Sequence, residues 1–152
     1  MINENLKLSG QLSIVLKDKA GNIKDQREVK NLVVNAGLGF IASRMKGTAK
    51  DVMSHMALGS GSTSAAAGNT DLGSILGSRE ALDSTTIAGT NDEQVVYVAT
   101  FEAGDATGAV TEAGIFNAAT SGDMLCRTVF SVVNKAADDT MSVTWTISLS
   151  AS

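Results

Sequence analysis

The sequence predicts a mainly β protein, an antiparallel β-sandwich with one short helix near residues 36–46. From Leu6 to Lys17 the even positions are mostly apolar and the odd ones mostly polar, which is the period of a half-buried strand. In the second half of the chain, strand-like runs recur at regular spacing between Gly, Asn and Asp turn signals. That pattern is typical of a sandwich or barrel built from hairpins. Helical spacing is convincing in one segment.

The N-terminal third is expected to form a hairpin followed by the helix. Residues 18–22 have the composition of a short turn, and residues 23–30 form a polar return strand, so the hairpin covers about residues 6–30. Asn35 is expected to cap the helix, and Gly47 to end it. The apolar stripe expected to face the core consists of Leu38, Ile41, Ala42 and Met45.

The remaining chain is predicted to be strands joined by turns. Residues 53–58 form a strand, residues 59–69 a Gly/Ser/Thr/Ala loop and residues 70–77 a short helical turn. Further strands are expected at 78–87, 93–102, 110–118, 124–133 and 140–151. In the last of these, five large apolar residues alternate with Ser and Thr, which places a row of hydroxyls on the other face. Such a row suits contact with a polar strand surface or a partner chain.

Length and composition indicate a single β-sandwich domain over residues 1–152. The chain is 43% apolar and 18% charged, which is ordinary for a globular protein. It has no apolar run of the roughly 18–20 residues that span a bilayer, and its start lacks signal-peptide character. We therefore expect synthesis in a cytoplasm and no membrane partner. A single cysteine, Cys126, excludes an internal disulfide, and its alternation with apolar neighbours predicts a buried thiol.

Charge is distributed unevenly along the chain. Residues 1–50 carry nine Lys/Arg and four acids (9 − 4 = +5), whereas residues 51–152 carry three and twelve (3 − 12 = −9). Opposite charges favour docking onto another copy or onto a neighbouring protein. Nucleic acid is disfavoured as a partner, because Phe40 is the only aromatic residue in the basic part. The candidate partner contacts in the hairpin are Lys7, Lys17, Lys19, Lys24, Arg27 and Lys30.

The residues that could take part in catalysis do not indicate an enzyme. His55 is the only histidine and lies in an apolar run, so a structural role is favoured over a hydrolytic one. Residues 59–63, Gly-Ser-Gly-Ser-Thr, lack the spacing of a phosphate-binding loop, and we interpret them as a flexible or partner-ordered surface loop. Glu112 beside Gly114 is interpreted as an exposed cross-strand or intersubunit pair, for instance with Arg127. No catalytic residue, cofactor or metal site is predicted.

A succession of short motifs carries a family resemblance. Asn31 to Gly37 precede the helix, Met56 to Thr63 contain the glycine turn, and Glu112 to Ala118 contain a Glu-Ala-Gly bend before residues 124–127 and the Thr-rich last strand. From about Leu6 to the end, the chain resembles small accessory virion proteins of tailed bacteriophages, which include tail-fibre-like and capsid-decorating proteins. The resemblance implies a trimer with a β-sandwich or jelly-roll core. The segment before the Glu-Ala-Gly bend departs from the family, because Gly108 to Thr111 replace its acidic and aromatic residues.

Two functions follow as expectations. The first is a non-enzymatic capsid decoration (cement) protein, located in the virion after synthesis in the host bacterial cytoplasm, whose partner is the major capsid protein. The alternative is a tail-tip, baseplate or fibre protein that contacts other tail proteins, an adaptor or a host receptor through loops 59–69 and 104–108. A hydrolase that uses His55 ranks last.

Overall fold

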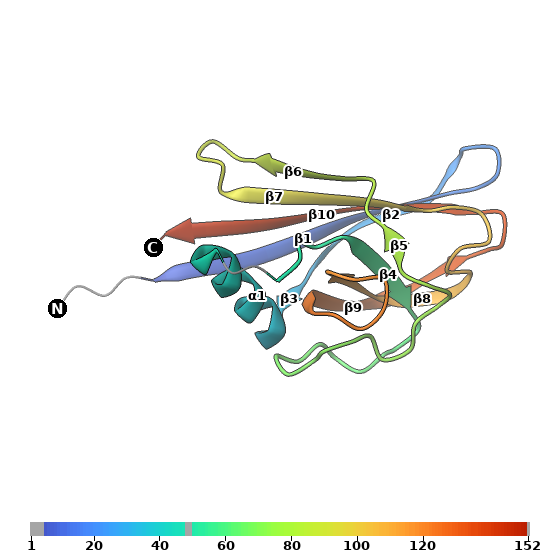
Figure 1. Ribbon diagram of the computed structural model, residues 1–152. Coiled ribbons are helices and arrows are strands. Elements are labelled where there is room, and N and C mark those ends of the chain that lie inside the picture. The colour runs from blue at the N-terminus through green and yellow to red at the C-terminus, as the bar shows by residue number, and fades with distance from the viewer. Residues whose placement is uncertain (1–4, 48–49, 152) are drawn as a thin grey trace.

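Two antiparallel five-stranded sheets pack face to face in the computed structural model, which describes residues 5–47 and 50–151 (Figure 1). In sheet A the strands run in the order β2-β1-β10-β7-β6, and in sheet B in the order β3-β9-β8-β4-β5. Sheet A comprises β1 (Leu6–Lys17), β2 (Ile23–Lys30), β6 (Ser84–Ala88), β7 (Gln94–Phe101) and β10 (Thr140–Ala151). Sheet B comprises β3 (Leu32–Val33), β4 (His55–Gly59), β5 (Glu80–Ala81), β8 (Gly108–Phe116) and β9 (Met124–Lys135). The predicted β-sandwich and the N-terminal hairpin are therefore confirmed.

The alternation of the two longest strands places the core. β1 and β10 pair in register from Leu6 opposite Ala151 to Lys17 opposite Thr140. On their inner faces Trp145 lies between Leu12 of β1 and Tyr97 of β7, and the Trp145 side chain is fully buried. Inward residues of sheet B, such as Ile115, complete the same apolar cluster. The apolar face predicted for the last strand is thus the centre of the sandwich.

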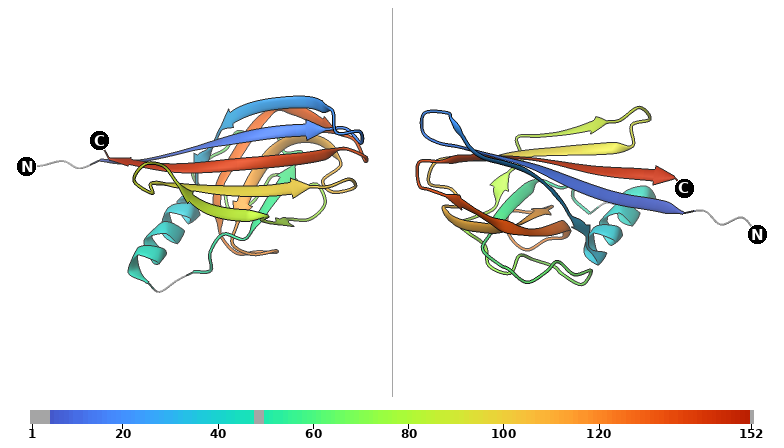
Figure 2. Two further views of the ribbon diagram at one scale, coloured as in Figure 1. Left: turned by 90° about the horizontal axis from the view of Figure 1, so that it is seen from above. Right: turned by 180° about the vertical axis from the view of Figure 1, so that it is seen from behind.

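Sheet A is longer than sheet B at one end. There the start of β1, the end of β10 and the β6–β7 hairpin project beyond sheet B, and helix α1 (Asn35–Lys46) lies beneath them (Figure 1). Seen from above, the helix extends outward from the sandwich to one side (Figure 2). No helix among the described residues has the length and apolar character needed to cross a lipid bilayer.

The helix forms as predicted, but its core-facing residues differ. Gly37 and Phe40 are buried, whereas Leu38 and Met45 of the predicted stripe are 47% and 84% exposed. Gly37 is required because a Cβ there would overlap the backbone carbonyl of Leu125. The closest approach of helix to sheet therefore occurs at a residue without a side chain, which apolar periodicity does not reveal.

The prediction for the C-terminal end of the helix is confirmed, and the prediction for its N-terminal end is wrong. Gly47 ends it in the left-handed conformation, with a φ of 78°, as expected. The N-cap is Val34 rather than Asn35, and no side chain caps this end. Asn35 instead begins the helix, and its backbone N–H donates to the carbonyl of Ala67 in the glycine-rich loop.

Two predictions between β4 and β7 are wrong. Residues 70–77 form no helical turn. Their backbone bends repeatedly, and around Ile75 it pairs with β4 at Gly59, where the N–H of Leu76 donates to the Leu58 carbonyl. The strand predicted at 78–87 is divided into β5 in sheet B and β6 in sheet A. Between them the Leu82 N–H donates to the Ser54 carbonyl, which precedes β4 of sheet B. The Asp83 N–H donates to the Val98 carbonyl on β7 of sheet A. The chain thus crosses between sheets at this point.

Candidate functional site

The carboxylate of Glu112 is the centre of a buried polar cluster on sheet B. Its Oε1 accepts hydrogen bonds from the backbone N–H groups of Gly61 (2.9 Å) and Ser74 (2.7 Å), and its Oε2 accepts one from Gly73 (2.9 Å). Arg127, on the adjacent strand β9, donates to Oε2 from Nε (3.0 Å) and from Nη2 (2.8 Å). One side chain thus binds two distant parts of the 59–77 loop to the sheet.

The glycines of this loop allow its backbone to approach the carboxylate. A Cβ at Gly59 would lie 2.5 Å from Glu112 Oε1, and a Cβ at Gly61 would overlap the carboxylate. The backbone N–H groups of Gly61, Gly73 and Ser74 therefore form an anion cradle, as in a phosphate-binding loop, but it is occupied by the protein's own glutamate. The expectation of a flexible or partner-ordered loop is wrong, because internal hydrogen bonds hold it.

The predicted pairing of Glu112 with Arg127 is confirmed, but the expected exposure is wrong. Glu112 is 0% and Arg127 2% exposed, so neither side chain reaches the surface of a single copy. Arg127 also donates from Nη1 to the side-chain oxygen of Asn69 (3.0 Å). Burial raises the pKa of Glu112, but hydrogen bonds from Gly73, Ser74, Arg127 and Gly61 outweigh it and lower that pKa overall. The pair therefore joins the 59–77 loop to sheet B in the interior of a single copy.

Two of the six basic candidates in the hairpin have partners within the chain. Lys24 Nζ lies 2.6 Å from Asp139 Oδ2 and so links the β1–β2 turn to the β9–β10 turn. Arg27 pairs with Asp25 at 2.6 Å and donates to the carbonyl of Ser131 on β9, closing one edge of the sandwich. These two side chains hold elements of the fold together.

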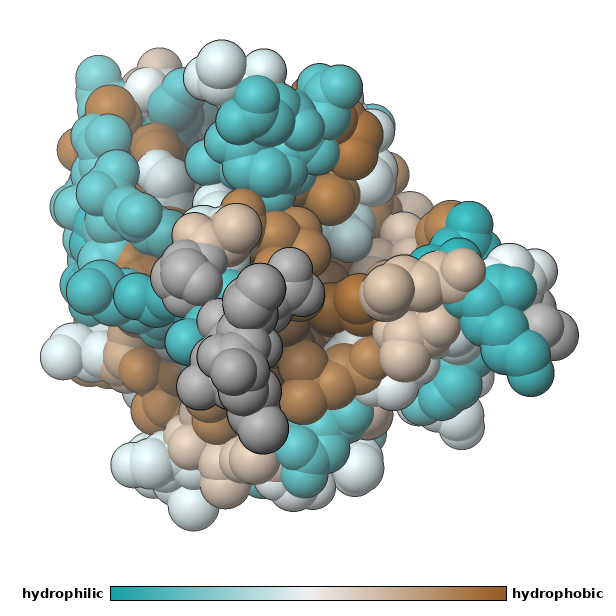
Figure 3. Space-filling model, turned by 90° about the vertical axis from the view of Figure 1, so that its left-hand side faces the viewer, coloured by the Kyte–Doolittle hydropathy of each residue, from teal (hydrophilic) through white to brown (hydrophobic). Residues whose placement is uncertain are grey.

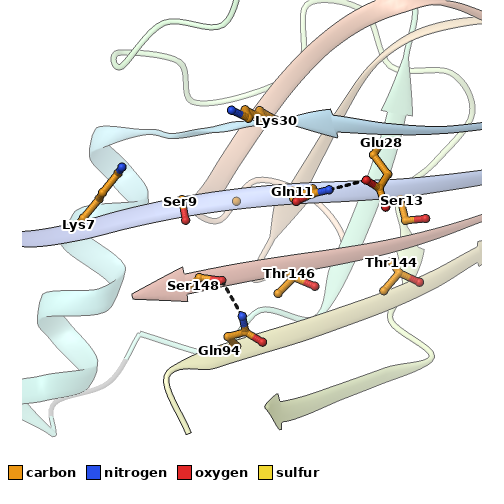
Figure 4. Close-up of a pocket in the computed structure, with 11 residues that line it drawn as sticks. Lys7, Ser9, Gln11, Ser13, Glu28, Lys30, Gln94, Thr144, Thr146 and Ser148 are labelled. Carbon is orange, nitrogen blue, oxygen red and sulfur yellow. Dashed lines mark hydrogen bonds between the residues drawn. The ribbon is translucent and has the colours of Figure 1, made fainter. Parts of the chain in front are cut away.

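The other four basic candidates, Lys7, Lys17, Lys19 and Lys30, are exposed. None of them forms an ion pair with another described residue. Lys17 and Lys19 lie at the β1–β2 turn. Lys7 and Lys30 lie toward the opposite end of the hairpin, on the outer face of sheet A (Figure 4). The four exposed lysines therefore lie in two separate places, one at each end of the hairpin.

Lys7 and Lys30 border a polar depression on the outer face of sheet A, which we call the hydroxyl trough. It is a broad, open hollow of about 700 Å³. Its lining comes from four strands and consists of Lys7, Ser9, Gly10, Gln11, Ser13, Glu28, Lys30, Gln94, Thr144, Thr146 and Ser148. Two hydrogen bonds order its edges, from Gln11 to Glu28 (2.8 Å) and from Gln94 to Ser148 (3.2 Å) (Figure 4).

The strand period creates this surface from the sequence. Odd positions of β1 and even positions of β10 share the outer face because Ser9 pairs with Ser148, Gln11 with Thr146 and Ser13 with Thr144. Hydroxyl and amide groups can each donate and accept hydrogen bonds. Because these side chains are short, they leave a depression above the sheet. The trough therefore presents a polar surface, with a lysine on each of two strands. The sequence predicted its β10 row; Gln94 of β7 was missed because its place depends on strand order.

His55, the remaining candidate for chemistry, is half-buried at the start of β4. Its Nδ1 lies 2.8 Å from the hydroxyl of Ser54, the preceding residue. Within the described parts of the chain no carboxylate is hydrogen-bonded to the imidazole, so a serine–histidine–acid triad is not assembled there. Over the same residues no group of three or more His, Cys, Asp or Glu side chains is placed to hold a metal ion.

Fold and surface together define an antiparallel β-sandwich with a polar depression on the outer face of sheet A. Comparisons with protein-family models, curated proteins and solved structures gave no match to this chain.

Proposed function

We propose that this protein is a non-enzymatic structural component of a tailed-bacteriophage virion, a capsid decoration protein that adheres to the head through the hydroxyl trough. The virion context rests on the motif resemblance, and the observation that carries the binding role is the trough itself. The trough combines hydroxyl and amide groups over a wide area with lysines at its border. Such a surface is suited to a polar, acidic protein partner.

Cementing requires many modest contacts rather than one tight site. A homotrimer, as the resemblance implies, presents three copies of the trough to a shell that repeats its own surface. Linked contacts multiply the apparent affinity without any new interaction in each copy. The major capsid protein is the proposed partner, and its acidic surface would face Lys7 and Lys30.

The first experiment locates the protein on particles and measures their stability. Antibody labelling in electron microscopy is expected to decorate heads, and particles lacking the protein are expected to lose resistance to heating. Label confined to the tail, with heat resistance unchanged and adsorption altered, would overturn the cement proposal and favour the tail-tip or fibre role.

The second experiment tests the trough directly. The double variant Lys7→Glu/Lys30→Glu is added to particles that lack the protein, and binding is measured by co-sedimentation. We expect at least about a tenfold loss of affinity, since two lysine contacts would become repulsive. The matched control is Lys17→Glu/Lys19→Glu, which makes the same charge change at the other end of the hairpin. An equal loss for both variants would show that net charge, not the trough, governs binding.

A further inference from the structure

The projecting end of sheet A has an apolar surface that the other described residues do not bury, which we call the end groove. Leu8, Ile147, Leu149 and Val95 form its upper wall, and Phe40 and Ile41 of α1 form its lower wall. The groove has a volume of about 350 Å³, and among the described residues Arg44 is the only charged one that lines it. Figure 3 shows this hydrophobic surface between hydrophilic residues at the top and the projecting helix on the right.

The apolar surface is exposed on the helix wall of the groove and also beyond the groove on sheet A. Ile87 pairs with Val95 on the inner face of sheet A and is 60% exposed, and Leu6 of β1 is 67% exposed. Met45, on the helix wall, is 84% exposed. Single exposed apolar residues are ordinary, but several large ones around one groove mark an interaction surface.

The charges on either side of the groove indicate what covers it. The β6–β7 turn above the groove carries Asp92 and Glu93, and the C-terminal turn of the helix below carries Arg44 and Lys46. Among the described residues none of these four side chains forms an ion pair within its own chain. The groove is thus flanked by an acidic turn at the end of sheet A and by the basic end of the helix, and neither has a charged partner among the described residues.

A second copy of this chain satisfies both the apolar and the charged requirements. When copies are arranged around an axis with their grooves facing it, the acidic side of each copy meets the basic side of the next. The apolar walls then close against one another at the centre. This pairing repeats until the ring closes, so no charged side is left over.

We propose that the end groove is the surface through which copies of this protein associate into a closed cyclic oligomer. The inference names the contact that would form the oligomer of the proposed function. Its test uses purified protein alone, so it can fail while the virion role stands, and the reverse is also true.

The experiment measures the molar mass of the full chain in solution by light scattering and sedimentation between about 1 and 100 μM. The wild-type protein is expected to form a discrete dimer or trimer. Met45→Glu is expected to raise the dissociation constant about tenfold to a hundredfold, the effect of losing one buried methionine contact. Because Met45 is exposed in a single copy, the variant should keep the wild-type circular dichroism spectrum and unfolding temperature.

Ile23→Glu provides the matched control. Ile23 is 57% exposed, like the groove residues, but lies at the other end of the molecule beside the β1–β2 turn. This variant should leave the molar mass unchanged. Arg44→Glu is expected to weaken association, and Arg44→Glu/Asp92→Lys to restore it in part, because the double variant exchanges the charges of the two sides. A wild-type monomer at all concentrations, or an oligomer insensitive to Met45→Glu, would overturn the inference.

Discussion

Replacing Glu112 with glutamine should destabilise the fold more than any exposed substitution, because five hydrogen-bond donors converge on this carboxylate. Oε1 accepts two backbone N–H groups, and Oε2 accepts a third together with two nitrogens of Arg127. Glutamine replaces one of these oxygens by an NH2 group, so in either orientation donors face a donor. The Arg127 guanidinium also loses its charged partner in a site that is 2% exposed.

The magnitude follows from the burial of the pair. Removing one partner of a buried ion pair costs about 3–5 kcal/mol, which lowers the unfolding temperature of a domain of this size by about 6–20 °C. Trp145, the only tryptophan, is fully buried, so its fluorescence reports unfolding in urea or on heating. Glu102→Gln, a matched change at an exposed position, should alter stability by less than about 0.5 kcal/mol.

Arg127→Met removes the guanidinium and keeps the Glu112 carboxylate, so it measures the two members of the ion pair separately. It should cost less than Glu112→Gln, because Glu112 keeps its three backbone N–H donors, whereas Arg127 without the carboxylate keeps only Asn69 as a partner among the described residues. The reasoning is refuted if Arg127→Met is the more damaging variant, or if Glu112→Gln unfolds within 1 °C of the wild type.

Three further predictions concern single positions. Gly61→Ala should lower the free energy of unfolding by about 1–3 kcal/mol through overlap with Glu112, whereas Gly39→Ala, in open space on the helix, should raise it by about 0.5–1 kcal/mol; urea unfolding measures both. Burial raises the pKa of the Cys126 thiol, so Ellman's reagent should label it only after unfolding, and rapid native labelling would contradict the structure. Hydrogen bonds from Lys24 and from the Ala136 N–H lower the pKa of Asp139, so its stabilisation is present above pH of about 4 and is lost in acid. The stability difference between Asp139→Asn and the wild type should therefore be full at pH 7 and shrink progressively as the pH falls below about 4; a constant difference would refute the linkage.

The fold was predictable where alternation alone decides it. β1 and β10 are half-buried along most of their length, so period two placed both faces correctly, including Trp145 in the core and the hydroxyl row outside. Periodicity failed where the decisive contact comes from elsewhere in the chain. Gly37 is buried because it meets the Leu125 carbonyl, a contact that no pattern within the helix encodes.

The candidate site shows the same division. The sequence paired Glu112 with Arg127 because the two residues are near neighbours across adjacent strands. It did not predict their burial, since the cover is a loop whose Gly61 lies 51 positions earlier in the chain. Likewise, Lys7 and Lys30 were indistinguishable from Lys24 and Arg27 by residue type. Only the position of Asp139 and of the β9 carbonyls separates the groups.

Because β10 contributes to both proposed surfaces, self-association and attachment can be tested against each other. Its outward Thr146 and Ser148 line the hydroxyl trough, and its inward Ile147 and Leu149 line the end groove. In a cyclic oligomer all troughs have the same inclination to the axis, so a repeating shell can engage several at once. Met45→Glu should then lower both the molar mass and attachment to particles. Lys7→Glu/Lys30→Glu should lower attachment while the oligomer persists. If Met45→Glu abolishes association but attachment is unchanged, multivalency contributes nothing to binding, and each copy must hold the shell alone.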